Sequence, residues 1–185
     1  MILEKECICV KIGKGDDRRL KRVLVIGCPG AGKSTLARRL HELTDLPLYH
    51  LDLIWHLPDR SHVSQDAFDE RLSEILSKDR WIIDGNYGRT LETRLDRCDT
   101  VLFLDYPLDV CLSGAEGRVG KKRCDLPWVE ETFDDAFRQW ILDFPTTQLP
   151  QIYELLERVA DEKEIFVFHD RPEVDEWIKT IEERI

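Results

Sequence analysis

The fold of this protein is decided by residues 23–35, which read Val23-Leu24-Val25-Ile26-Gly27-Cys28-Pro29-Gly30-Ala31-Gly32-Lys33-Ser34-Thr35. The first four are apolar without polar alternation, which predicts a strand covered on both faces. The next eight, residues 27–34, match the pattern G-x-x-x-x-G-K-[S/T] completely, and Thr35 follows them. Apolar residues then recur at helical spacing: Leu36, Ala37, Leu40 and Leu43. The stretch therefore predicts a buried strand, a glycine-rich loop and an amphipathic helix.

The loop has the composition needed to bind phosphate. Its glycines let the chain bend so that successive backbone N–H groups point at phosphate oxygens, and the helix dipole adds to the same attraction. Lys33 can reach the β- and γ-phosphates, Ser34 offers its hydroxyl to Mg²⁺, and Thr35 is a further phosphate contact. We therefore expect ATP and Mg²⁺ to bind at Gly27, Cys28, Pro29, Gly30, Ala31, Gly32, Lys33, Ser34 and Thr35.

The rest of the chain alternates between two patterns. Short apolar runs predict strands at 81–83, 101–104 and 165–168, with 48–51 as a weaker fifth. Helical spacing lies between them at 68–76 (capped by Ser64), 108–115, 133–144, 152–159 and 174–181. This alternation predicts a three-layer α/β fold, with a five-stranded, mainly parallel sheet flanked by helices.

Composition limits the class of protein. Acidic residues outnumber basic ones by 37 to 27, and the net charge of −10 makes direct nucleic-acid binding unfavourable. No apolar run approaches the ~20 residues that cross a bilayer, and the charged N-terminus lacks the pattern of a signal peptide. We expect a cytoplasmic protein without a membrane partner. The six cysteines have no metal-type or disulfide-type spacing, and we expect them to be reduced.

Residues 1–21 are charged and interrupted by glycine, which predicts a mobile N-terminal extension outside a single domain of residues 22–185. The alternation of Ile8, Val10 and Ile12 leaves a short edge strand as the alternative. The sequence leaves the oligomeric state open.

The metal-side carboxylate has two candidates. A phosphate loop of this type needs an aspartate at the end of a neighbouring strand to hold the water shell of Mg²⁺. Asp84 and Asp105 each follow a predicted strand, and periodicity does not choose between them.

The order of these motifs resembles the adenylate-kinase-like group of small P-loop kinases. Beyond the loop itself, this resemblance rests on the strand spacing and on the Asp84-Gly85 pair. More closely, the chain from about residue 22 to 182 is similar to the proteins called "DNA topology modulation protein". The similarity lies in Tyr49-His50-Leu51-Asp52, Trp55, Trp81-Ile82-Ile83-Asp84-Gly85-Asn86-Tyr87 and Leu102-Phe103-Leu104-Asp105.

The resemblance implies roles for several residues. It favours Asp84 over Asp105 as the carboxylate that serves Mg²⁺. It implies a short lid at about residues 118–129, in which Arg118 or Arg123 neutralises charge on the transferring phosphoryl group. A solvated charge run is the plainer interpretation of these basic residues.

On the acceptor side, Asp52 follows the weak second strand. In kinases of this architecture a carboxylate there orients or deprotonates the acceptor hydroxyl, while a helix cap is the plainer interpretation. Arg89 and Arg94 are candidates to bind an acceptor phosphate. However, Asp84-Gly85-Asn86-Tyr87-Gly88-Arg89 lacks the proline of the adenylate-kinase pattern Asp-Gly-x-Pro-Arg and has one more residue, which counts against a nucleoside monophosphate.

These observations predict an ATP- and Mg²⁺-dependent phosphotransferase that acts on a small acceptor, a nucleotide or a nucleoside. The alternative is a nucleotide-binding regulator whose ATP state affects DNA topology or a protein partner.

Overall fold

A computed structural model describes residues 20–184 of the chain. The predicted mobile extension, residues 1–21, lies almost entirely outside the described residues. Within them the strands are β1 (Arg22–Gly27), β2 (Leu48–His50), β3 (Trp81–Asp84), β4 (Thr100–Leu104) and β5 (Glu164–Phe168). They form one sheet in the order β2-β3-β1-β4-β5, and every neighbouring pair is parallel. The predicted five-stranded sheet is confirmed, and it is parallel throughout.

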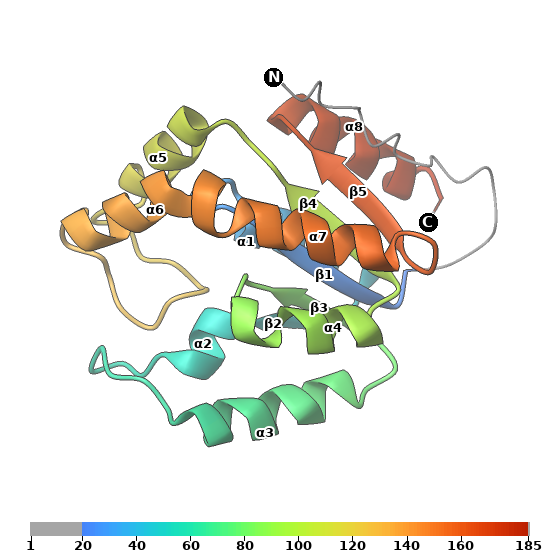
Figure 1. The fold of residues 1–185 in the computed structure, drawn as a ribbon, viewed down its shortest axis with the longest axis horizontal. Coiled ribbons are helices and arrows are strands. Elements are labelled where there is room, and N and C mark those ends of the chain that lie inside the picture. Colours follow the sequence, from blue (N-terminus) through green and yellow to red (C-terminus); the bar gives the residue numbers. More distant parts are fainter. Residues whose placement is uncertain (1–19, 185) are drawn as a thin grey trace.

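Helices cover both faces of the sheet (Figure 1). They are α1 (Lys33–Thr44), α2 (Leu51–Trp55), α3 (Gln65–Leu76), α4 (Leu91–Arg97), α5 (Leu108–Glu116), α6 (Asp135–Thr147), α7 (Leu149–Val159) and α8 (Arg171–Glu182). Ion pairs from Arg39 to Asp175 and Glu182 join α1 to α8 on one face. Arg158 of α7 pairs with Glu92 of α4 on the other. Strands β1, β3 and β4 are buried between these layers, as their unbroken apolar runs predicted.

Several boundaries differ from the expectation. The aromatic pattern at 133–144 predicted a helix from Phe133, but α6 begins at Asp135 because the Asp134 side chain caps it by accepting from the Phe137 amide. Helices α2 and α4 were not expected, since they are too short for helical periodicity to be visible. In the part of the chain that the structure describes, no helix is both long and apolar enough to cross a membrane.

The parallel arrangement brings the carboxyl ends of the strands to one edge of the sheet. Strands β1, β3 and β2 lie next to one another, and they end at Gly27, Asp84 and His50. In open parallel sheets, ligands bind outside this edge. The predicted functional residues therefore converge on one side of the molecule.

Candidate functional site

The predicted phosphate loop connects β1 to α1 directly. Gly30 and Gly32 have positive φ angles of 86° and 99°, which turn the chain back toward the helix. Gly32 is the N-terminal cap of α1, and no described side chain caps the helix there. Among the described residues the Lys33 and Ser34 N–H groups have no backbone partner and are left for a ligand, while the Thr35 amide donates to the Gly32 carbonyl at 3.0 Å. Lys33 Nζ lies over the bend, where it donates to the Cys28 carbonyl at 3.1 Å.

The loop is packed closely against α5. A Cβ added at Gly30 would lie 1.9 Å from the Cys111 carbonyl oxygen, and one added at Gly114 would lie 2.2 Å from the Gly30 carbonyl oxygen. Contact with the Cys111 thiol, together with burial, raises the pKa of Cys28 far above its usual range. Cys28 is therefore a neutral packing residue in the loop and not a thiolate nucleophile.

Asp84 lies at the end of β3, beside the loop, and is only 4% exposed. Its Oδ2 atom is 2.8 Å from Nδ1 of His50, the last residue of β2. Its Oδ1 atom is buried and has no hydrogen-bond partner among the described residues. A buried carboxylate oxygen without a partner is costly, so this atom fits a bound cation or its water shell. Within residues 20–184 no cluster of three His, Cys, Asp or Glu side chains could hold a metal alone. An ion here would therefore need phosphate or water oxygens as well.

Asp105, the other candidate, has different partners. Its Oδ2 atom accepts a 2.6 Å hydrogen bond from the Tyr153 hydroxyl and lies 3.8 Å from His169 Nδ1. Asp105 therefore contacts α7 through Tyr153 and the end of β5 through His169.

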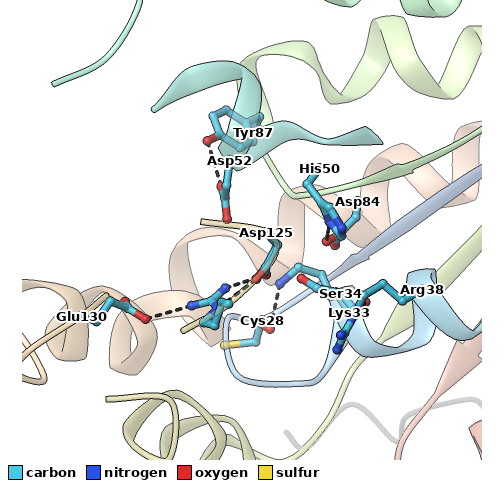
Figure 2. Close-up of polar contacts among 11 residues, drawn as sticks. Cys28, Lys33, Ser34, Arg38, His50, Asp52, Asp84, Tyr87, Asp125 and Glu130 are labelled. Atoms are coloured by element: carbon cyan, nitrogen blue, oxygen red, sulfur yellow. Dashed lines mark hydrogen bonds and ion pairs between the residues drawn. The ribbon is translucent and has the colours of Figure 1, made fainter. Parts of the chain in front are cut away.

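Asp52 lies in the first turn of α2 and not at the end of a strand, because β2 already ends at His50. The Tyr87 hydroxyl donates to Asp52 Oδ1 at 2.9 Å. Burial raises the pKa of Asp52, the Tyr87 hydrogen bond opposes this shift, and the negative charge of Asp84 adds to it. Burial lowers the pKa of Lys33, and the carboxylates of Asp84 and Asp52 counteract part of that shift. Figure 2 shows the side chains of Lys33, Asp52 and Asp84 in the same region of the site.

The aromatic residues near Asp52 pack mainly on one another. Tyr87 stacks on Phe68 with a centroid separation of 5.1 Å, and Trp55 stacks on His62 at 4.5 Å. Trp128 meets the edge of His56 at 5.0 Å, so residues after α5 reach the acceptor side. Trp55, Phe68 and Tyr87 therefore form an aromatic cluster, which contacts the Asp52 carboxylate through the Tyr87 hydroxyl.

Of the two arginines expected on the acceptor side, neither is free. Arg89 makes an exposed ion pair with Asp69, at 2.9 and 2.6 Å. Arg94 is fully buried and donates to the backbone carbonyls of residues 85, 86, 87 and 90. Burial lowers the pKa of Arg94 to about 9. The suggestion that Arg94 binds an acceptor phosphate is wrong, because its guanidinium is enclosed by these carbonyls.

The predicted lid, residues 118–129, contains no helix or strand and lies between α5 and α6. Arg118 has a buried Nε atom without a hydrogen-bond partner among the described residues. Burial lowers the pKa of Arg118, and the positive charge of Arg123 adds to that effect. Arg123 itself is neutralised, with contacts of 2.6 Å to Asp125 and 2.8 Å to Glu130. Of the two arginines, Arg118 is the one left to meet an anion.

Asp125 was not expected at this site. It is 4% exposed and pairs with Arg123 at 2.6 Å, and Figure 2 shows it beside the phosphate loop. Burial alone would raise the pKa of Asp125, but Arg123 and the Ser34 hydroxyl outweigh it and hold the pKa well below its usual range. No sequence pattern marked Asp125, since its position depends on how an irregular segment folds back.

Asn86 was quoted as part of a motif but was given no role. Its side-chain Oδ1 accepts from the Gly27 amide at 2.9 Å, and its Nδ2 donates to the Gly27 carbonyl at 2.7 Å. The segment after β3 is thus fastened to the first residue of the phosphate loop.

Comparison with solved structures finds the same architecture in three kinases. A shikimate kinase from Bacteroides thetaiotaomicron matches over 89% of this chain and 98% of its own, with a TM-score of 0.52 and 19% identity. A gluconokinase from Sinorhizobium meliloti matches over 90% and 93%, with a TM-score of 0.52 and 14% identity. A shikimate kinase from Acinetobacter baumannii, in complex with shikimate, matches over 88% and 93%, with a TM-score of 0.55 and 15% identity. These similarities confirm the predicted fold class.

No family model and no curated protein matches the sequence. The resemblance to the "DNA topology modulation protein" family therefore stays a prediction.

Proposed function

We propose that this protein is an ATP-dependent kinase that transfers the γ-phosphoryl group to a hydroxyl of a small molecule. One observation carries the proposal: the side chains of Lys33, from the phosphate loop, and Asp52, from the acceptor side, lie in the same region of the site, together with Asp84 (Figure 2). A site that holds a triphosphate at one end and a hydroxyl near a carboxylate at the other suits in-line phosphoryl transfer. The fold that the chain shares with shikimate kinases and a gluconokinase supports the same assignment.

In the proposed reaction each residue has a defined task. The loop amides and Lys33 hold the β- and γ-phosphates. Asp52 accepts a hydrogen bond from the acceptor hydroxyl and takes up its proton as the oxygen bonds to the γ-phosphorus and the bond to the β,γ-bridging oxygen breaks. Arg118 neutralises charge that develops on the transferring group. Arg123 does not contact the transferring group in this proposal, because its guanidinium is paired with Asp125 and Glu130.

The metal side of the proposal rests on Ser34 and Asp84. The unpartnered Oδ1 atom of Asp84 and the Ser34 hydroxyl are oxygen donors of the kind that Mg²⁺ prefers. When bound, Mg²⁺ would neutralise charge on the β- and γ-phosphate oxygens. His50 holds the other Asp84 oxygen and so fixes the orientation of the carboxylate.

For the acceptor, we propose a nucleoside before a nucleotide. An acceptor phosphate would need a cation on the acceptor side, and of the arginines expected there Arg94 is enclosed and Arg89 is paired with Asp69. Trp55 and Tyr87, whose rings meet at a steep angle, are the aromatic residues next to Asp52 that a nucleobase would contact.

The test is a direct screen for transfer. The purified 185-residue chain would be incubated with ATP, Mg²⁺ and single acceptors from four groups: nucleosides, nucleoside monophosphates, neutral sugars and sugar acids. ADP release and the mass of the phosphorylated product are measured together. We expect acceptor-stimulated ADP release and a product heavier by one phosphoryl group, with the strongest response among the nucleosides.

Asp52→Asn is the matched variant for this screen, because it keeps the shape of the side chain and removes the base. It should retain ATP binding and lose transfer. ATP consumption that no acceptor stimulates would contradict the proposal, and so would full transfer by Asp52→Asn.

A further inference from the structure

The side chain of Asn86 contacts the phosphate loop in an unusual way. Both hydrogen-bonding groups of its amide are used on one residue, since Oδ1 accepts from the Gly27 N–H at 2.9 Å and Nδ2 donates to the Gly27 C=O at 2.7 Å. Gly27 is the last residue of β1 and the first of the loop. Asn86 therefore fixes the peptide groups on both sides of the residue at which the loop begins.

The register of the sheet explains why a side chain is needed there. Strand β1 pairs with β3 up to Val25 opposite Asp84, and the Gly85 amide still donates to the Val25 carbonyl at 3.2 Å. Two residues further along this register, Gly27 would lie opposite Asn86. In a continued parallel ladder the Gly27 N–H would donate to the Gly85 carbonyl, and the Gly27 carbonyl would accept from the Tyr87 N–H. The chain has already left the sheet after Gly85. The Asn86 amide supplies the missing donor and acceptor in their place.

Arg94 satisfies the carbonyls that this departure frees. Its Nη1 atom donates to the Gly85 carbonyl at 2.8 Å, and its Nη2 atom donates to the carbonyls of Asn86 and, at 3.0 Å, Tyr87. Unpaired carbonyls at this depth would be costly. Because the guanidinium is fully buried, it holds residues 85–87 in one conformation.

The turn at residues 85–87, which Asn86 and Arg94 hold in place, continues directly to the acceptor side. Tyr87 follows Asn86 with a φ of 36°, a conformation that residues other than glycine rarely adopt. Its hydroxyl then reaches Asp52 at 2.9 Å. One short turn thus contacts the phosphate loop through Asn86 and the acceptor carboxylate through Tyr87.

We propose that Asn86 is a positioning residue for phosphoryl transfer, which holds the start of the phosphate loop in its binding conformation and in fixed relation to Asp52. The inference rests on the proposed function of the site, but it concerns a residue to which that function assigns no chemistry. Asn86 acts through Gly27 and does not itself need to touch ATP.

Asn86→Ala tests the inference, with ATP affinity measured by calorimetry well below the melting temperature. Two hydrogen bonds to the loop are lost, so we expect the Kd and the KM for ATP to rise roughly 10- to 30-fold. The kcat should fall much less. Asn86→Asp keeps the acceptor for the Gly27 N–H but sets a carboxylate against the Gly27 carbonyl, and it should weaken ATP binding at least as much. Gln139→Ala is the control, because it removes a 2.9 Å amide hydrogen bond on the exposed face of α6 and should leave the Kd unchanged.

A purely structural role would lower the melting temperature and leave the Kd and the KM for ATP unchanged, and that result would overturn the inference. Amide hydrogen exchange of the wild-type chain gives a test that needs no variant: the Gly27 amide should be strongly protected, and exchange at the rate of an open loop would also overturn it. If the wild-type chain binds ATP but transfers phosphate to no acceptor, the proposed function fails while the comparison of ATP affinities still decides the role of Asn86.

Discussion

The Tyr87 hydroxyl donates a 2.9 Å hydrogen bond to Asp52 Oδ1, and this contact joins the turn after β3 to helix α2. The bond stabilises the ionised form of Asp52, against burial and the charge of Asp84, which both raise its pKa. A base that takes a proton from an acceptor hydroxyl must be ionised before the reaction. In the proposed reaction, Tyr87 would therefore extend to lower pH the range in which Asp52 can act as the base.

Tyr87→Phe should move the acid limb of the pH–rate profile to higher pH. The variant keeps the ring that stacks on Phe68 and removes only the hydroxyl, so the pKa of Asp52 rises and the base is protonated over a wider range. The measurement is kcat/KM for the acceptor between pH 5 and pH 9, with roughly a 10-fold loss expected on the acid side. An acid limb that stays in place would show that Asp52 is not the titrating base.

Lys33→Ala should abolish most of the affinity for ATP while the protein stays folded. Removing a charge-assisted contact to phosphate should weaken binding about 100-fold, as measured by calorimetry. Lys122→Ala, which removes an exposed cation from the predicted lid, is the control and should have little effect. Wild-type turnover in Lys33→Ala would contradict the assignment of the phosphate loop.

Asp84→Asn and Asp105→Asn should separate the two metal-side candidates. We expect Asp84→Asn to weaken ATP binding about 10-fold or more when Mg²⁺ is present, and to leave it unchanged or slightly stronger in EDTA. Asp105→Asn should affect neither, because its carboxylate is bonded to Tyr153. If the Mg²⁺-dependent part of the affinity disappears in Asp105→Asn instead, the choice between them is reversed.

Asp125→Asn should destabilise the protein by about 1–3 kcal/mol at neutral pH, since it leaves the half-buried Arg123 with one carboxylate partner fewer. The folded-state pKa of Asp125 is depressed, so its contribution is fully present above the ordinary value of 3.8 and is lost as the pH falls toward the folded-state value. Denaturant unfolding from pH 7 to pH 3 should show a constant difference between variant and wild type down to about pH 5, then a smaller one. A difference that does not change with pH would show that packing, and not charge, is responsible.

Gly30→Ala and Gly32→Ala should differ in cost although both positions have positive φ. At Gly32 an added methyl group meets nothing within 4 Å, so only backbone strain of about 1–2 kcal/mol is expected. At Gly30 it would lie 1.9 Å from the Cys111 carbonyl and 2.7 Å from the Ala115 amide, and the loss should exceed about 3 kcal/mol. The free energy of unfolding measures both, and equal losses would mean that the loop can move away from α5.

The fold was predictable because its signals are local. Each buried strand is a continuous apolar run, and the loop between Gly27 and Thr35 has a fixed spacing that few other structures require. Helix α2 escaped prediction because its five residues are too few for periodicity. This is also why Asp52 was assigned to a strand end.

Residues of the candidate site could be predicted from the sequence only where a functional side chain comes at or directly after the end of a buried strand. Asp84 could be named from its position after β3, but its partner His50 is brought beside it by the pairing of β2 with β3. Asn86 and Gly27 are 59 residues apart, and no pattern in either segment marks the contact. Arg94 belongs to a helix that reads as polar, so its complete burial could be seen only in three dimensions.

The contact of the Gly30 and Gly114 backbones has a consequence for motion. Neither position has room for a side chain, so the phosphate loop and the body of α5 interlock and must travel as one unit. Any swing of the segment after α5 then pivots at Gly117 or Gly120, beyond the interlocked turn. Arg118 lies between these two glycines, so a swing of the segment about either of them would displace this arginine less than it displaces the tip.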